Sequence, residues 1–374
     1  MAAPDPLLGL SLLDGEYTIL ERIGAGGMGA VYKARQAALN RFVALKVLHT
    51  KFANRKEVLT RFRREARILS QLTHPNTLRV FDTGMLDDGR FYIVMELLEG
   101  RSLHRVIRTE APLDEARAAL IVSQVAFALD EAHAAGVLHR DIKPENIFLQ
   151  ATPADLEFPK VLDFGLAKLD ESLLPPGSVA ITKQGAVFGT PEFMSPEQAR
   201  GEVMCAQSDV YSLAVVLYEA LSGKLPFNAG SPMEWVVHHS HAVPIPLADR
   251  IPGLAFSPAI LAIIDRALAK DPAQRFSSAR AFGDALLALA PPEPDASADT
   301  VQYSGEERVT LNVVGGGSSR HDSARPSAVG SLRGTGRGPS LVMSTPAIVG
   351  LAVGFVMLGA GIAFVAMRLF GGVS

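Results

Sequence analysis

Residues 139–146 read His-Arg-Asp-Ile-Lys-Pro-Glu-Asn, and Asp-Phe-Gly follows at residues 163–165. No other part of the sequence restricts the possible folds so strongly, because an octapeptide this specific rarely arises by chance. Together the two segments supply two aspartates, a lysine and an asparagine. Phosphoryl transfer needs such a set: one carboxylate orients the attacking hydroxyl, an ammonium group offsets the developing charge, and hard oxygen ligands hold Mg²⁺.

A glycine-rich segment at residues 23–31 contains the pattern Gly-x-Gly-x-x-Gly-x-Val. Glycines let the backbone fold closely over phosphate groups and present its N–H groups to them. The pattern alone is ambiguous, because a dinucleotide-binding turn and a glycine-rich hairpin without a ligand share it. Residues 31–34 continue as a strand rather than opening a helix, which argues against the dinucleotide-binding turn.

The apolar segment Val-Ala-Leu at residues 43–45 ends in Lys46, seventeen residues after Gly29. A lysine at the end of an apolar strand is costly unless it is paired or bound to an anion. Glu65, on the helix predicted to follow, is a candidate partner. Without such a partner, Lys46 is simply a surface lysine.

The first 290 residues divide into two parts by their predicted secondary structure. Residues 17–100 are mostly strands with one helix at 61–72, where apolar residues recur at helical spacing. Residues 101–290 are mostly helices, including one at 113–135 that Gly136 is placed to end. This order predicts an α+β fold with two lobes.

Composition and charge exclude several classes of protein. The 374 residues are 48% hydrophobic and 20% charged, which rules out collagen-like, wholly disordered and disulfide-framework chains. The net charge of −3 gives no sign of nucleic-acid binding. The single cysteine, Cys205, allows no intramolecular disulfide and suits a reducing compartment. No Lys or Arg precedes the apolar patch at residues 7–13, so we expect no secretory signal.

The C-terminal part of the sequence differs from the rest. Residues 291–345 hold eight Gly, nine Ser and five Pro in 55 positions, which predicts a disordered juxtamembrane linker. Residues 341–367 carry no charge over 27 positions, whereas a helix needs about 20 apolar residues to span a bilayer. We predict a transmembrane helix at 346–367, rather than a buried core helix, and a short extracytoplasmic tail at 368–374.

Arginines flank this span unequally: Arg325, Arg333 and Arg337 precede it, and Arg368 follows it. The positive-inside rule therefore places the N-terminal bulk of the chain in the cytoplasm, attached to the cell membrane by a single pass. Gly350 and Gly354 form a Gly-x-x-x-Gly pattern through which two helices can approach closely, so a homodimer is a candidate assembly.

These motifs, in this order, resemble those of the bacterial eukaryotic-like (Hanks-type) serine/threonine protein kinase family over residues 17–288. Further matching segments are Phe-Arg-Arg-Glu-Ala at 62–66, Tyr-Ile-Val-Met-Glu at 92–96 and Gly-Thr-Pro-Glu-Phe-Met-Ser-Pro-Glu-Gln at 189–198. The resemblance implies an N-terminal extension at 1–16 and a bilobal protein-kinase catalytic domain at 17–290. Its N-lobe would be strand-rich with one helix, and its C-lobe mainly helical.

The resemblance also implies an ATP site. Lys46 would hold the α- and β-phosphates and pair with Glu65, and Met95 would be the gatekeeper. The residues implied to cover the phosphates are Gly24, Gly26 and Gly29. Those implied to enclose or contact adenine are Ile23, Val31, Ala44, Glu96, Leu98 and Phe148.

Catalytic roles follow from the same resemblance. Asp141 would be the base and Lys143 the charge stabiliser, with Asn146 and Asp163 as ligands of Mg²⁺ or, alternatively, Mn²⁺. A stack of four side chains, anchored by Asp209, would be assembled in the active state. Its members would be Leu69, Phe81, His139 and Phe164.

Regulation is implied at three positions. Arg140, directly before the catalytic aspartate, would bind an activation-loop phosphate. Thr182 is the favoured autophosphorylated hydroxyl, and Thr190 precedes the segment that would contact the substrate peptide. Lys143 and Thr190 indicate serine/threonine specificity, and Glu197 is expected to pair with Arg275 as a structural contact.

The sequence thus predicts a membrane-anchored kinase that uses ATP and acts on protein substrates, without a nucleic-acid partner. The alternative is a catalytically weak, membrane-tethered scaffold that binds nucleotide. A small-molecule phosphotransferase is a third reading, and the intact activation and peptide-platform segments argue against it.

Overall fold

The computed structural model describes residues 5–26, 29–50, 60, 63, 66–152, 157–164 and 190–289. The chain divides into two units, Met1–Thr300 and Val301–Ser374, and every described residue belongs to the first. The predicted linker at 291–345, membrane helix at 346–367 and tail at 368–374 lie outside the described residues. Within the described ranges, no helix is both long and apolar enough to cross a bilayer.

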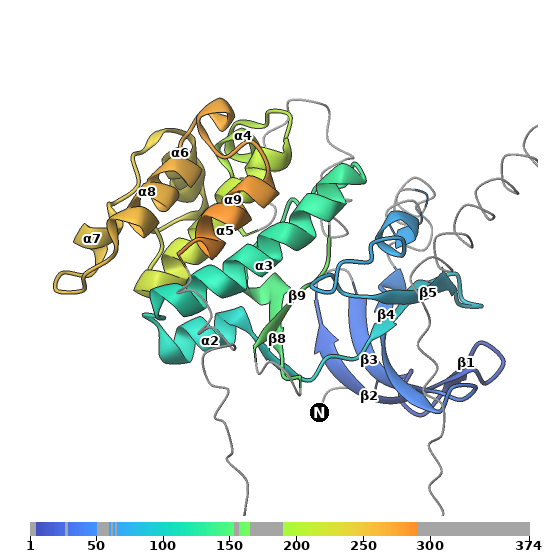
Figure 1. Cartoon of the computed structure of the whole chain (residues 1–374). Helices are drawn as coiled ribbons and strands as arrows, with labels where there is room; N and C mark the ends of the chain where they lie inside the picture. Colours follow the sequence, from blue (N-terminus) through green and yellow to red (C-terminus); the bar gives the residue numbers. More distant parts are fainter. Residues whose placement is uncertain are drawn as a thin grey trace, which may run out of the picture. The chain divides into compact units, whose positions relative to one another are not determined.

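An antiparallel six-stranded sheet forms the first lobe, drawn in blue in Figure 1. The strand order is β1-β2-β3-β4-β6-β5. The strands are β1 (Ser11–Leu12), β2 (Tyr17–Ala25), β3 (Gly29–Gln36), β4 (Arg41–Leu48), β5 (Val80–Met85) and β6 (Phe91–Glu96). Residues 23–25 of the glycine-rich segment end β2 and residues 29–31 begin β3, so the segment joins two antiparallel strands.

The two faces of this sheet pack into different cores, as β4 shows. Val43, Leu45 and Val47 are buried in a core on one face, which the sheet shares with the N-terminal segment. Ala44 and Leu48 point to the opposite face and join the large core that continues into the second lobe. Because side chains alternate along a strand, Lys46 also lies on this second face.

Residues 5–16, which the sequence assigns to an N-terminal extension, pack against the first lobe. Leu7 is 5% exposed within the outer core, and Leu12 and Leu13 pack against the same core. Strand β1 pairs with β2, and Asp5 accepts hydrogen bonds from the Tyr32 hydroxyl at 3.0 and 3.2 Å. The structural unit thus begins before Tyr17, because these apolar side chains cover the outer face of the sheet.

Replacing Asp5 by Ala is expected to lower the free energy of unfolding by about 1–3 kcal/mol, because the buried Tyr32 hydroxyl then loses its acceptor. The double variant Asp5→Ala/Tyr32→Phe removes both partners and should recover part of that loss. Urea denaturation of the full chain measures both. A stability of Asp5→Ala equal to that of the wild type would show that this contact contributes nothing.

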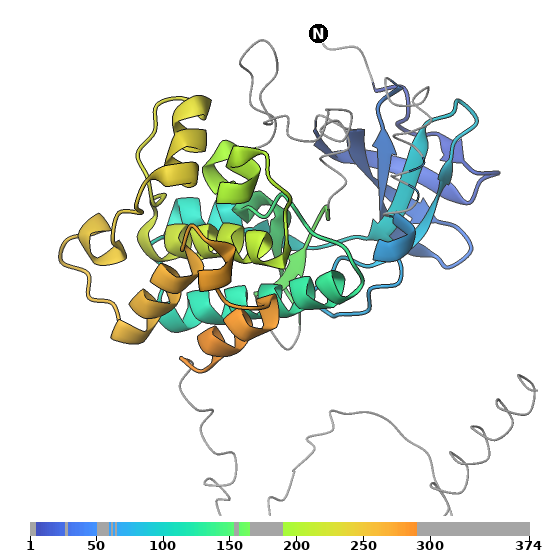
Figure 2. The same cartoon turned by 90° about the horizontal axis from the view of Figure 1, so that it is seen from above.

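Helices build the second lobe, drawn from cyan through green to orange in Figure 2. They are α2 (Leu103–Glu110), α3 (Glu115–Ala134), α4 (Pro196–Arg200), α5 (Ala206–Ser222), α6 (Pro232–His241), α7 (Leu247–Arg250), α8 (Pro258–Ala267) and α9 (Ala279–Leu287). Helix α3 confirms the helix predicted at 113–135, with Gly136 at φ +77° just past its end. Helix α5 is buried almost all round, as an apolar helix in a core should be.

A small second sheet adjoins the octapeptide at residues 139–146, which is called the reactive loop below. Its strands, in the order β7-β8-β9, are β7 (Gly100–Ser102), β8 (Ile147–Gln150) and β9 (Phe158–Val161). The octapeptide at 139–146 lies between α3 and β8, and its last three residues form the 3₁₀ helix η2 (Pro144–Asn146). Asp163 follows β9 by two residues, so the β8–β9 hairpin places the two motifs side by side.

Candidate active site

The loop that begins at His139 is held by one buried carboxylate, Asp209 on α5. Asp209 accepts hydrogen bonds from the backbone N–H groups of His139 at 2.8 Å and Arg140 at 2.9 Å. A third bond comes from His133 Nε2 on α3, at 2.8 Å. Burial raises the pKa of Asp209, but these donors outweigh burial and bring the pKa below its usual range. The bonds hold Arg140 at φ +66°, a conformation uncommon outside glycine.

The fully buried His139 connects this loop to the segment around Asp163. Its Nε2 donates to the Leu162 carbonyl at 2.8 Å, and its ring lies 4.8 Å from the Phe164 ring, centroid to centroid. Burial lowers the pKa of His139, so the ring is neutral and packs as part of the core.

The stack predicted around His139 is right except at one position. Leu69, Val80 and Phe164 line a common cavity between the lobes. Phe81 instead packs against the outer core of the first lobe, so the prediction for Phe81 is wrong and Val80 takes its place. The physical reason is a register shift between Val80 and Asp82 in β5, which disturbs the alternation of side chains along the strand.

Three side chains of the reactive loop, together with that of Thr190, form one hydrogen-bonded group. Lys143 Nζ lies 2.9 Å from Asp141 Oδ2 and also donates to Thr190 Oγ1 at 2.9 Å. Asn146 Nδ2 donates to the Asp141 carbonyl at 2.8 Å and to its Oδ2 at 3.2 Å. The Asp141 carboxylate is thus fixed by a cation and an amide that both bind the same oxygen, Oδ2.

Lys46 reaches across from the first lobe to Asp163. Its Nζ lies 2.5 Å from Asp163 Oδ1, and the Lys46 side chain is 11% exposed. A buried ammonium needs such a partner, so the surface-lysine alternative does not apply. Glu65, the partner predicted from the sequence, lies outside the described residues.

The glycine-rich turn is shaped by close backbone contacts. A Cβ on Gly29 would lie 2.2 Å from the Val47 carbonyl oxygen, so no other residue fits there. The Gly26 N–H donates to the Gly29 carbonyl at 2.9 Å, which closes the turn. Around the Cβ position of Gly26 nothing lies within 4 Å, so a ligand can approach the backbone there.

One cavity of about 320 Å³ brings the glycine-rich turn and the reactive loop together. This volume lies at the lower end of the range typical of small-molecule sites, about 300–1,000 Å³. Its lining residues come from both lobes: Gly24, Ala25, Gly26, Gly29, Val31, Lys46, Asp141, Lys143, Asn146 and Asp163.

The other residues predicted to contact adenine are not part of this lining. Ala44 is buried opposite Met95 in the β4–β6 pairing, and Ile23 is 47% exposed. Leu98 lies between β6 and β7, and Phe148 is paired with Ser102 in the small sheet. The Glu96 carboxylate binds Lys160 Nζ at 2.8 Å.

Of the three predicted regulatory residues, the structure describes two. Arg140 is exposed and lines a small separate pocket with Thr190 and Gln198. Gln198 Nε2 also donates to the Arg140 carbonyl at 2.9 Å. Thr182 lies outside the described residues.

The residues present fit a divalent cation. Asn146 and Asp163 line the same cavity, and the Leu162 N–H donates to the Asn146 carbonyl at 2.8 Å, which keeps the two residues adjacent. Mg²⁺ takes oxygen ligands and usually binds through one or two side chains together with substrate phosphates. Within the described ranges, no group of three or more His, Cys, Asp or Glu side chains is placed to hold a metal ion.

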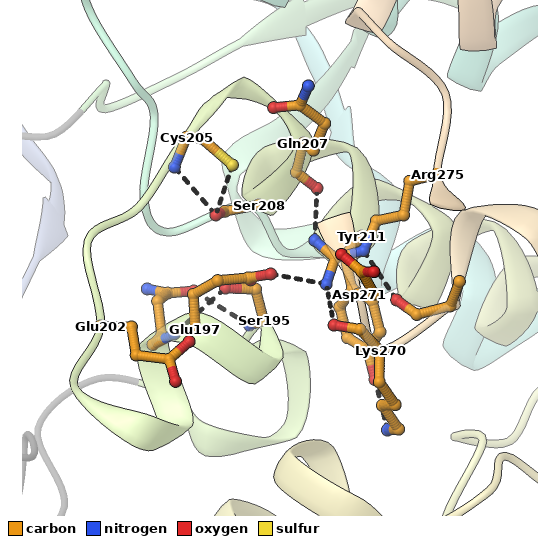
Figure 3. Close-up of polar contacts among 12 residues, drawn as sticks. Ser195, Glu197, Glu202, Cys205, Gln207, Ser208, Tyr211, Lys270, Asp271 and Arg275 are labelled. Carbon is orange, nitrogen blue, oxygen red and sulfur yellow. Dashed lines mark hydrogen bonds and ion pairs between the residues drawn. The ribbon is translucent and has the colours of Figure 1, made fainter. Parts of the chain in front are cut away.

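Two supporting residues have no role assigned to them from the sequence. His133 and Gln198 bind Asp209 and the Arg140 carbonyl, although they lie 76 and 58 residues from these partners. Glu197 and Arg275 form the predicted pair, with Arg275 Nη2 2.7 Å from Glu197 Oε1. Figure 3 shows this pair beside the start of α5.

Comparisons with known proteins agree with this geometry. The family model described as protein kinase domain matches residues 17–287. The chain is 44% identical over 274 residues to the serine/threonine-protein kinase pkn3 of Myxococcus xanthus, covering 73% of this chain and 50% of that protein. It is 39% identical over 287 residues to the serine/threonine-protein kinase PknB of Mycobacterium tuberculosis, covering 76% of this chain and 44% of PknB. The chain thus spans half the length, or less, of these curated relatives.

Solved structures give the same result. The crystal structure of the Mycobacterium tuberculosis PknI kinase domain matches with a TM-score of 0.56 at 29% sequence identity. The match covers 76% of this chain and 98% of that one.

Proposed function

Because the chain belongs to the protein kinase family, we propose that it transfers the γ-phosphate of ATP to serine and threonine hydroxyl groups of proteins. The observation that carries the proposal is the shared cavity between the lobes. It contains the glycine-rich turn and Lys46 on one side, and Asp141, Lys143 and Asn146 on the other. The relatives named serine/threonine-protein kinase support the choice of substrate hydroxyl.

The side chains of the reactive loop have complementary tasks in this reaction. Lys143 and Asn146 both bind Oδ2 of Asp141, which leaves Oδ1 to accept a hydrogen bond from the attacking hydroxyl and orient it. The Lys143 ammonium offsets negative charge as it develops. Thr190 holds that ammonium in place through its hydroxyl oxygen.

The opposite wall of the cavity suits the nucleotide phosphates. The Lys46 ammonium lies at this wall, oriented by Asp163, and the glycine-rich turn leaves open space above its backbone. Asn146 and Asp163 would hold Mg²⁺, with Mn²⁺ as the alternative ion. When bound, the metal–ATP complex supplies the phosphoryl group that is transferred.

One experiment tests the activity directly. The full-length chain is incubated with γ-labelled ATP, Mg²⁺ and casein, and the labelled protein is hydrolysed in acid to identify the phosphorylated residue. We expect phosphoserine and phosphothreonine. Nucleotide binding without any label on casein or on the chain itself would favour the catalytically weak scaffold instead.

Activation through Arg140 and Thr182 is part of the proposal. The Arg140 side chain is exposed while its backbone is fixed by Asp209 and Gln198, so its guanidinium is accessible to a phosphate nearby. Phosphopeptide mapping after incubation with ATP should find Thr182 modified. An unmodified Thr182 in a preparation whose activity has risen would contradict this assignment.

We also propose that residues 346–367 anchor the chain in the cell membrane as a single pass, with the kinase domain in the cytoplasm and residues 291–345 as linker. The uncharged run of 27 residues and the arginines before it support this placement. Gly350 and Gly354 would then allow a homodimer within the membrane.

In a vesicle flotation assay, the full-length chain is expected to float with lipid and to resist extraction by alkaline carbonate. A variant truncated after residue 340 should stay in the soluble fraction, because it lacks the apolar run. Equal behaviour of the two proteins would contradict the membrane anchor.

A further inference from the structure

A cluster of three polar side chains is hydrogen-bonded to the segment that follows Thr190. Its members, called here the His239 cluster, are Tyr211 on α5, His239 on α6 and Lys270 after α8. Tyr211 and His239 are both fully buried. Figure 3 shows Tyr211 and Lys270 beside Arg275, whose guanidinium carbon lies 5.0 Å from the centre of the Tyr211 ring.

Every hydrogen bond of this cluster has a fixed direction. His239 Nε2 lies 2.9 Å from the Glu192 carbonyl oxygen, which can only accept, so Nε2 carries the proton. Burial, and then the nearby Lys270 charge, lower the pKa of His239 to about 3, so the ring is neutral. Its Nδ1 is therefore an acceptor and takes the bond from the Tyr211 hydroxyl, at 3.1 Å.

Lys270 completes the series. Its Nζ donates to the Tyr211 hydroxyl oxygen at 3.3 Å and to the carbonyl oxygens of His238 and His239 at 3.2 and 2.9 Å. These two carbonyls belong to the last turn of α6, where a cation is favourable. The bonds therefore run in one direction, from Lys270 through Tyr211 and His239 to the Glu192 carbonyl.

The end point of this series is close to the reacting groups. Glu192 belongs to the 3₁₀ helix η5 (Pro191–Phe193), directly after Thr190. Thr190 in turn accepts the hydrogen bond from Lys143, which binds Asp141. The same segment is also held by apolar packing, since Met194 and Val236 of α6 share a small core. Helix α6 thus fixes this segment by one directed hydrogen bond and one apolar contact.

We propose that His239 is a positioning residue for phosphate transfer to protein substrates. Through the Glu192 carbonyl it fixes η5 and Thr190, and thereby the surface on which the substrate chain lies beside Asp141. This inference rests on the proposed kinase function. It concerns the protein substrate rather than the nucleotide, because among the described residues the hydrogen bonds of the His239 cluster lead to the Glu192 carbonyl and not to the cavity lining beside Lys46.

Two amide variants distinguish the effect of losing the hydrogen bond to Glu192 from the effect of placing an amide side chain in this buried site. In His239→Gln the amide nitrogen can replace Nε2 and still donate to the Glu192 carbonyl. In His239→Asn the shorter side chain can replace Nδ1, accept from Tyr211, and lose the bond to Glu192. Both are uncharged, so they differ chiefly in which half of the hydrogen-bond series they keep.

The test measures kcat and KM of the full-length chain for casein and for ATP. We expect His239→Asn to lower kcat/KM for casein about tenfold, with KM for ATP changed less than about twofold. We expect His239→Gln to remain within about threefold of the wild type for both substrates. The proposal would be overturned if the Asn and Gln variants had equal kinetic constants. It would also be overturned if His239→Asn lowered kcat/KM for casein and raised KM for ATP by the same factor.

A second variant covers the case in which His239→Asn does not fold. Tyr211→Phe removes only the hydroxyl that orients the His239 ring, and it should lower kcat/KM for casein about threefold while KM for ATP is kept. An unchanged casein kcat/KM in this variant would also overturn the proposal. A wild-type chain that phosphorylates no protein would instead refute the proposed function itself, so the two failures are distinguishable.

Discussion

Replacing Asp141 by Asn is expected to lower the initial rate of phosphate transfer to a protein substrate by at least about 10²-fold. The asparagine keeps the shape of the side chain and can still accept the hydrogen bond from Lys143, which is 2.9 Å long in the wild type. It lacks the negative charge and the basicity with which Asp141 orients the attacking hydroxyl. Initial rates with γ-labelled ATP measure the loss, and a titration with fluorescent nucleotide should show that nucleotide affinity is retained.

Asp87→Asn is the matched control, because it makes the same chemical change at an exposed position in the loop between β5 and β6. It should phosphorylate substrate at the wild-type rate. If Asp141→Asn and Asp87→Asn were equally active, Asp141 would not be the catalytic base.

Replacing Arg275 by Leu is expected to lower the free energy of unfolding by about 3–5 kcal/mol, because it leaves a buried carboxylate without its partner. The Arg275 side chain is fully buried, and the side chain of Glu197 is 4% exposed. The guanidinium also binds three carbonyl oxygens, drawn in part in Figure 3: those of Ala269, Gln207 and Lys270. Urea denaturation of the full chain measures the change.

Arg280→Leu serves as the control for this prediction. Arg280 also pairs with a carboxylate, Asp130 at 3.2 Å, but its side chain is 59% exposed. Exposed pairs contribute about 0–1 kcal/mol, so this variant should remain close to the wild type. A similar loss of stability in both variants would show that burial of the Glu197–Arg275 pair has no special consequence.

The reacting groups could be predicted because they are close together in the sequence. Asp141, Lys143 and Asn146 lie within six residues, and the structure joins them by bonds of 2.8 to 3.2 Å. The groups that hold this loop could not be predicted in the same way. His133 and Gln198 come from α3 and α4, and only the packing of those helices against α5 and the loop brings them to their partners.

The strand predictions show a second limit. Along β4 the side chains alternate regularly, with Val43 and Leu45 in one core and Ala44 in the other, because the strand has no irregularity. In β5 the place in the stack that the family resemblance implied for Phe81 is taken by Val80, and a register shift lies directly after Val80. A bulge depends on how two strands fit together, and one strand's sequence does not contain that information.

The N-terminal segment illustrates the role of distant partners. The family resemblance begins at residue 17, so it leaves the apolar residues between positions 7 and 13 as part of an N-terminal extension. Leu7 is buried only because the outer face of the sheet offers an apolar surface, made by side chains such as Tyr17 and Val94. The prediction of the two lobes is unaffected, since each rests on long segments with regular periodicity.

The central claim is that a phosphoryl group is transferred in the cavity between the lobes from ATP to protein hydroxyls. The most direct test compares ATP labelled at two different phosphates. The full-length chain is incubated with casein and Mg²⁺ and with ATP labelled at either the γ- or the α-phosphate. The account predicts label on serine and threonine from γ-labelled ATP, and none from α-labelled ATP. Incorporation of the α-label, or no incorporation from either nucleotide, would contradict it.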